Sequence, residues 1–279
     1  MKYVRFLFTF GLVGILGACA STPPASFNPQ YSKALNIARA AGIDAKLKDV
    51  EVPKDTVNNI TDSAGFGFAM AASGYKAPIP GFSPNQMAAM NFTAWLLAPE
   101  ADSARNSMFA WVPETEANGK PVDHLADLLL EAASKGAKDM GYTPKQTIAK
   151  GGTDKSGVGV YLMDGDGSAC QNKGEFSTCW IGFALRDPDK ESDAPSFVGT
   201  SGDNWFFDPS ANVYSRFVFL KDNQGLNELE LLVATSKYLP EWVYFYAAPN
   251  KIKFNSEESL KIPVIINQGK VLYFVRPEA

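Results

Sequence analysis

One short segment of this 279-residue chain, residues 164–175, carries potential metal ligands at a recognisable spacing. Counted from the first of them, oxygen-bearing side chains occupy the positions that an EF-hand loop uses for its ligands, namely Asp164, Asp166, Ser168, Asn172 and Glu175. Calcium prefers such clustered oxygen ligands, and a glutamate as the last of twelve positions is typical of that loop. The segment is therefore a candidate calcium site.

Other features of the same segment favour a metal-free loop between two strands. Ala169 stands where an EF-hand has the glycine of its sharp turn, and Gln171 stands at the usual apolar position. The flanking sequences are typical of strands instead of helices. Glycine and aspartate are also residues that turns prefer, so the plain loop is the favoured interpretation and calcium the alternative.

A second candidate site is an alternating aromatic stretch. On a strand, Trp242, Tyr244 and Tyr246 would share one face, with Val243 and Phe245 on the other. An exposed face of this kind can stack on sugar rings or anchor a partner protein. A strand buried on both faces gives the same pattern, and we favour that core interpretation.

Residues for catalysis do not assemble into a known pattern. His124 is the only histidine, so a Ser-His-Asp mechanism would have to use it, and the serine motif at 199–203 lacks the last glycine of G-x-S-x-G. One histidine and two cysteines do not make a usual zinc site. Residues 150–156 resemble a phosphate-binding loop but have Asp154 where a glycine should precede Lys155. Paired carboxylates of a glycosidase leave no such signature, so that class stays open.

The first residues have the layout of an export signal. Lys2 and Arg5 precede an apolar stretch over residues 6–16, which ends in Leu16-Gly17-Ala18-Cys19. A helix that crosses a bilayer needs roughly 20 apolar residues, whereas this stretch has about eleven. The sequence therefore predicts a leader that is removed, over residues 1–18, and not a membrane span.

The residues Leu16 to Cys19 resemble the lipobox of bacterial lipoproteins. In that family the cysteine thiol receives a diacylglycerol, signal peptidase II cuts before the cysteine, and a fatty acid such as palmitate is added to the new amino group. The resemblance implies that Cys19 is the first mature residue and anchors the protein, since stable anchoring needs more than one acyl chain. Ala20, where an aspartate would retain an inner-membrane protein, favours the outer membrane of a Gram-negative host. An ordinary signal cleaved after Ala18 is the alternative.

With Cys19 assigned to lipid, Cys170 and Cys179 remain as a pair. In an oxidising compartment two cysteines so close in sequence are expected to form a disulfide. Closing so short a loop stabilises the fold by roughly 2–3 kcal/mol on the chain-entropy model. A redox-active pair is the weaker interpretation, because the spacing is not C-x-x-C.

Composition limits the class of protein and of partner. Hydrophobic residues make up 46% and charged residues 20%, which is typical of a globular chain. Removing Lys2 and Arg5 from the 26 basic residues leaves 24 against 30 acidic ones, which argues against nucleic acid as a partner. The expected partners are the membrane, through the lipid anchor, and an envelope protein or glycan.

The pattern along the chain predicts an α+β fold, with an N-terminal helical region followed by a mainly antiparallel β-sheet. Residues 19–30 form a polar, proline-containing tether, and residues 31–279 form a periplasmic domain that is divided, in one interpretation, into two lobes near 143–157. Helices are expected over 31–41, 55–72, 85–97 and 123–140, the last capped by Asp123. Strands are expected over 158–163, 180–185, 213–220, 242–247, 262–266 and 271–275, with a hairpin turn at 267–270. Residues 226–235 suit a helix or a strand.

The functional hypothesis is a lipid-anchored envelope protein that binds or scaffolds a component of a periplasmic or outer-membrane assembly and is not an enzyme. Its basis is the anchor, the tether, the large domain and the lack of a recognised catalytic pattern. The alternative is an envelope hydrolase that acts on glycans through carboxylates that the sequence does not single out.

Overall fold

The computed structural model describes residues 25–43, 46–52, 105–148, 157–164, 170–191, 193–209, 215–220, 225–253, 259–260 and 262–278. Within these ranges the chain is α+β with mainly antiparallel sheets, as the sequence predicts. Cys19, Asp166, Ser168 and the helices expected over 55–72 and 85–97 lie outside the described residues.

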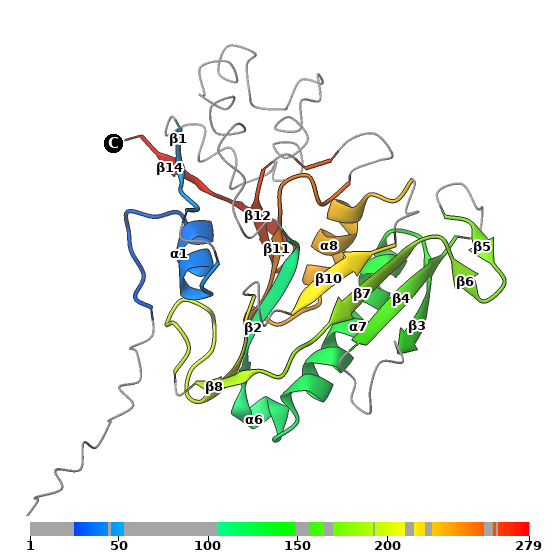
Figure 1. Ribbon diagram of the computed structural model, residues 1–279, viewed down its shortest axis with the longest axis horizontal. Helices are drawn as coiled ribbons and strands as arrows, with labels where there is room; N and C mark the ends of the chain where they lie inside the picture. The colour runs from blue at the N-terminus through cyan, green and yellow to red at the C-terminus, as the bar shows by residue number, and fades with distance from the viewer. Residues whose placement is uncertain are drawn as a thin grey trace, which may run out of the picture.

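The centre of the molecule is an antiparallel six-stranded sheet in the order β13-β12-β11-β2-β9-β8 (Figure 1). Its strands are β2 (Ser107–Pro113), β8 (Asp189–Glu191), β9 (Asn204–Phe207), β11 (Val243–Ala247), β12 (Val264–Asn267) and β13 (Lys270–Tyr273). Every residue of β2 and β11 is buried. Both faces of these strands must therefore be covered by other elements.

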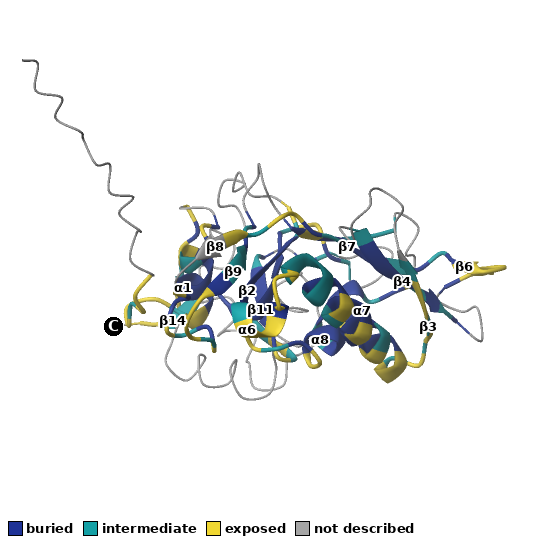
Figure 2. Ribbon diagram, turned by 90° about the horizontal axis from the view of Figure 1, so that it is seen from below, coloured by how far each residue is buried: buried dark blue, intermediate teal, exposed yellow. Residues whose placement is uncertain are grey.

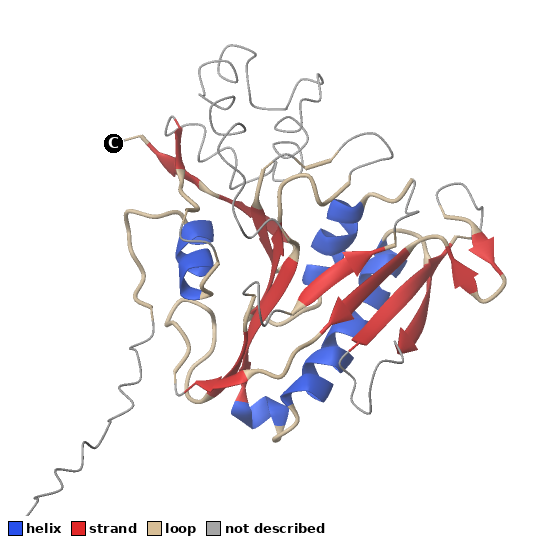
Figure 3. Cartoon of the chain, in the orientation of Figure 1, coloured by secondary structure: helices blue, strands red, loops and turns tan. Residues whose placement is uncertain are grey.

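Different elements cover the two faces. On one face lie α7 (Pro121–Asp139), α8 (Glu228–Ser236) and a second sheet, which share a hydrophobic core with Met108, Ala110 and Phe245. On the other face α1 (Lys33–Ala40) packs on Phe109, Trp111 and the tyrosines of β11, together with residues from 194–198. Figure 3 shows α1 on one side of this sheet and the two longer helices on the other.

The second sheet has four antiparallel strands in the order β10-β7-β4-β3. They are β3 (Thr143–Ile148), β4 (Gly157–Met163), β7 (Trp180–Ala184) and β10 (Arg216–Phe219). The ring of Phe245 in β11 lies 6.1 Å from that of Phe183 and 5.3 Å from that of Phe217, so the two sheets meet through aromatic contacts. Described residues on both sides of 143–157 contribute to this shared core.

Smaller elements complete the fold. They are the parallel pair β1 (Val50–Val52) and β14 (Val275–Pro277), the hairpin β5 (Asn172–Lys173) and β6 (Phe176–Ser177), and the short helix α6 (Glu114–Ala117). Figure 2 shows the β6 end as an exposed projection and α7 with a buried and an exposed side. None of the helices in the described part of the chain is long and apolar enough to cross a membrane.

Several local predictions from the sequence are confirmed. Helices α1 and α7 lie within or close to their expected ranges, and Gly141 with φ +86° follows α7. The turn between β12 and β13 has Gln268 at φ 51° and Gly269 at φ 72°, the positive values of a type I′ hairpin. The ambiguous segment 226–235 forms α8, with Asn227 as its N-cap.

Two boundary predictions are wrong. Asp123 is not the cap of α7, because the helix begins two residues earlier at Pro121 and Asp123 lies in its first turn. The expected strand over 271–275 is two strands, since Phe274 separates β13 from β14. A proline at the first helical position is favourable because its missing N–H has no partner there in any helix.

Candidate functional site

An open groove of about 430 Å³ lies where β2 ends and β11 begins. Three segments line it, namely Pro113, Thr115 and Glu116 after β2, residues 199–201 before β9, and residues 240–242 before β11. The registers of β2 with β9 and with β11 place these segments together, because both partners run antiparallel to β2. Residues far apart in the sequence thus share one site.

Backbone hydrogen bonds hold two of these segments to β2. The amide of Trp111 donates to the carbonyl of Trp242 at 3.2 Å, and the amide of Glu114 donates to the carbonyl of Asp203 at 2.9 Å. The floor of the groove is therefore an extension of the central sheet, which makes it more rigid than a free loop.

Two buried asparagines fix the turns around the groove. The Asn267 side-chain amide donates to the carbonyls of Glu241 and Val243, both at 2.9 Å. Asn204, fully buried, accepts from the Thr200 hydroxyl at 3.0 Å and donates to the carbonyl of Gly202. Because each amide satisfies groups of a bent backbone, it specifies the shape of that turn.

Gly199 lets the backbone of the groove approach the Glu241 side chain closely. Its φ of +79° belongs to the left-handed region, and a Cβ at this position would lie 2.1 Å from Cδ of Glu241. The Glu241 side chain therefore packs directly on the glycine backbone. No other residue type combines this backbone angle with this close approach.

The groove is rich in hydrogen-bond acceptors. Glu116 and Glu241 contribute carboxylates, and Thr115, Thr200 and Ser201 contribute hydroxyls; among the described lining residues none is basic. His124 lies beside the groove, with Nε2 3.7 Å from Oε2 of Glu116 and its ring 6.4 Å from that of Trp242. Such a site can accept hydrogen bonds from ammonium, guanidinium or hydroxyl groups, and His124 can form an ion pair with Glu116 when protonated.

The aromatic residues singled out in the sequence form core, not an exposed face. Tyr244 and Tyr246 are buried on the α1 side of the sheet, where the Tyr244 ring stacks on Phe109 at 5.3 Å. Trp242 does not share their face, because it precedes β11 and packs with the residues on the opposite side. It is 3% exposed and is one of the residues that line the groove.

Tyr244 links the core to the groove electrostatically. Burial raises the pKa of its phenol strongly, and the negative charge of Glu241 raises that pKa further. Both effects disfavour the phenolate. The phenol therefore remains protonated where an unfolded tyrosine ionises.

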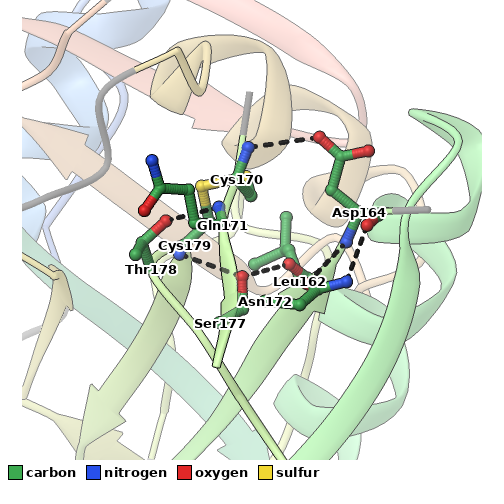
Figure 4. The surroundings of a disulfide bond; sticks show 8 residues. All are labelled: Leu162, Asp164, Cys170, Gln171, Asn172, Ser177, Thr178 and Cys179. Carbon is green, nitrogen blue, oxygen red and sulfur yellow. Dashed lines mark hydrogen bonds between the residues drawn. A yellow bond between two sulfur atoms is a disulfide. The ribbon is translucent and has the colours of Figure 1, made fainter. Parts of the chain in front are cut away.

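A disulfide joins Cys170, within the candidate calcium segment, to Cys179 beyond its end, as the sequence predicts. A carboxylate oxygen of Asp164 accepts from the Cys170 amide at 3.1 Å, and the Asn172 side chain bonds both the amide and the carbonyl of Asp164, at 3.1 and 2.7 Å (Figure 4). Glu175 is largely exposed and lies 3.3 Å from Lys145.

Of the five proposed calcium ligands, Asp164 and Asn172 thus lie together and stabilise the loop through the backbone. The remaining described one, Glu175, pairs with Lys145 of β3. Asp166 and Ser168 fall outside the described residues, and no group of three or more metal-binding side chains occurs within the described part. Calcium binding at this segment stays a prediction.

Sequence reasoning missed the two carboxylates that define the groove. It named His124, Trp242 and the segment 199–203 separately, yet gave no reason to join them. Glu116 and Glu241 lie outside strands and show no periodic pattern, so the missing signal was the pairing of β2 with β9 and β11. No family model, curated protein or solved structure matches this chain.

We predict that Asn267→Leu destabilises the fold by about 2–4 kcal/mol, because the buried carbonyl of Val243 and the part-buried carbonyl of Glu241 both lose their partner. Urea unfolding followed by circular dichroism measures the change. Gln171→Ala, at an exposed side chain, is the control and should cost less than about 0.5 kcal/mol. Equal stability of the Asn267 variant and the control would show that the amide does not fix the turn.

A second prediction concerns alkaline pH. Above about pH 10 an unfolded tyrosine loses its proton while Tyr244 in the fold keeps it, so stability falls by about 1.4 kcal/mol per pH unit. Tyr244→Phe removes this contribution, and its free energy of unfolding should fall less steeply with pH than that of the wild type. Urea titrations between pH 9 and 11 measure both slopes, with Tyr31→Phe, at a partly exposed tyrosine, as control. Parallel slopes for the Tyr244 variant and the wild type would contradict the prediction.

Proposed function

We propose that the chain is a bacterial lipoprotein, acylated at Cys19 and held on the outer membrane, whose folded domain is the binding component of an envelope assembly. The observation that carries the proposal is the sequence Leu16-Gly17-Ala18-Cys19 after a charged and apolar leader. The disulfide between Cys170 and Cys179 supports it, because such bonds persist in oxidising compartments outside the cytoplasm.

The arrangement of the domain suits an anchored binding protein. The described chain begins near α1, at one end of the long axis, whereas the β5–β6 hairpin lies at the other end (Figure 1). An anchor attached through residues 19–24 would thus leave the four-stranded sheet and its hairpin facing away from the membrane. A partner can reach that end without competing with the lipid.

The acceptor-rich groove gives the domain a candidate site for a partner. Glu116 and Glu241 would bind lysine or arginine side chains of an envelope protein, or the hydroxyls of a glycan. A rigid backbone around the carboxylates favours binding, since little conformational entropy is lost on association.

A second function is favoured by one specific observation. Glu116 and Glu241 line the same groove beside Trp242, and two carboxylates in one site are what a glycoside hydrolase requires. His124 lies beside Glu116, with Nε2 3.7 Å from its Oε2. We favour partner binding over this hydrolase function, because the groove is open and a hydrolase needs a site that encloses its substrate.

The anchor is tested by labelling cells with an alkyne analogue of palmitate. We expect label and membrane association for the wild type, and neither for Cys19→Ser, because the thiol that accepts the diacylglyceryl group is gone. The double variant Cys170→Ser/Cys179→Ser is the control and should keep its label. Full labelling of the Cys19 variant would refute the anchor, whatever the domain binds.

The two functions of the groove are separated by one pair of substitutions. A photoreactive residue in place of Thr115 should crosslink a reproducible envelope partner, and Glu116→Gln with Glu241→Gln should reduce that product at least about tenfold, as charge-assisted contacts are lost. Release of new reducing ends from purified cell-wall glycan, abolished by either single substitution, would establish the hydrolase instead. Thr143→Gln, an exposed position on β3, serves as control in both assays.

A further inference from the structure

The outer face of the four-stranded sheet has two glycines directly opposite each other. Gly159 of β4 and Gly182 of β7 are paired across the sheet, in strands whose alternate residues, among them Val160 and Ile181, face the core. A Cβ at Gly159 would lie 2.5 Å from the Trp180 indole, and one at Gly182 would lie 1.8 Å from it. The indole therefore lies flat across both glycines.

Such a pair is unfavourable for the sheet itself. Glycine in a strand interior weakens the strand and marks a place where another group approaches the backbone closely. At this position the approaching group is the ring of Trp180, which is half-buried with the sheet beneath it. The arrangement gives a planar aromatic surface on the side of the sheet opposite to α7.

Two further rings extend this surface. The Tyr161 ring lies 6.3 Å from Trp180 and 5.4 Å from Phe176, so the three form a row from β7 across β4 to β6. We call Trp180, Tyr161 and Phe176 the aromatic row. Phe176 is 57% exposed, at the hairpin that follows Cys170 and precedes Cys179. A large apolar ring that projects into water at the tip of a fastened hairpin is typical of a contact residue.

The charge around the aromatic row is opposite to that of the chain. Among the described residues of the outer face and the hairpin, Lys145, Lys173 and Arg216 are basic, and Glu175 is the one acidic residue. Lys145 lies directly across from Tyr161 in the sheet and pairs with Glu175 at 3.3 Å, so these three basic residues exceed the acidic one by two charges. The whole chain has a net charge of −4, so this positive rim indicates an anionic ligand.

We propose that the aromatic row and its basic rim bind the glycan strand of peptidoglycan. Flat aromatic rings stack on the apolar faces of sugar rings, and lysine and arginine complement the carboxylates of the peptide stems attached to this glycan. The surface lies at the end of the domain away from α1, where an anchored protein would reach the cell-wall layer. The placement of this surface towards the cell wall rests on the proposed function. The aromatic row and its basic rim are features of the four-stranded sheet and the hairpin, and they do not depend on that proposal.

The experiment uses the full chain in detergent, sedimented with purified peptidoglycan sacculi. We expect the wild type to sediment and its affinity to fall as salt rises. Phe176→Ala, at an exposed position that leaves the core intact, and Trp180→Ala should each weaken binding by roughly fivefold, the scale of one aromatic contact. Lys145→Gln with Lys173→Gln should reduce the salt dependence, because Arg216 is then the one basic residue left among the described residues of the rim. Tyr238→Ala, an exposed aromatic residue on another surface, is the control and should bind as the wild type does.

Other outcomes overturn the inference. Wild-type protein that stays in the supernatant, or that binds with unchanged affinity after Phe176→Ala, would show that the row is not the site. Equal binding to uncharged chitin, without salt dependence, would show that the ligand is not acidic. Palmitate labelling is measured in parallel. Wild-type protein that carries the label but does not bind sacculi counts against the row alone, and wild-type protein that binds sacculi without carrying the label counts against the anchor alone.

Discussion

The fold depends on the burial of both faces of two neighbouring strands, β2 and β11. All seven residues of β2 and all five of β11 are buried, so neither strand has a side that could face water. A sheet with two apolar faces is stable only when both are covered. This requirement accounts for α1 on one face and for α7, α8 and the second sheet on the other. The two helices on that face, α7 and α8, also pack closely against each other. A Cβ on Gly136 of α7 would lie 2.6 Å from the Thr235 backbone of α8.

The same constraint explains where polar chemistry is found. With the centre of the sheet closed on both sides, polar groups collect where its strands begin and end. At one such end the acidic groove lies over β2 and β11, and Asn204 and Asn267 satisfy the turns that surround it. A buried amide that loses its partner costs more than an exposed one, so these residues make the groove specific in shape.

The sequence predicts those elements of the fold that have a local residue pattern, and it misses those that have none. Helix α7 and the hairpin at residues 267–270 were predictable, because helical spacing and a glycine-containing turn are local patterns. Strand β2 was not predicted, since a strand buried on both faces has no alternation. The aromatic pattern of β11 was correctly assigned to core, but Trp242 was placed on the wrong face because the strand begins one residue later. Glu116 and Glu241 carry no local pattern at all and become neighbours only through the pairing of β2.

In the four-stranded sheet, the residues that form the core differ from the residues that form the proposed binding surface. One of its faces joins the core, and that alone accounts for Val158, Val160, Ile181 and Phe183. The stability of the core does not require Gly159 and Gly182 to face each other, and alanine or a β-branched residue at either would suit a strand better. Nor does it require Phe176 to remain exposed beyond the disulfide. Gly159 and Gly182 make room for the Trp180 ring, and Phe176 is exposed beside Tyr161, so the proposed binding surface accounts for residues that the core does not require.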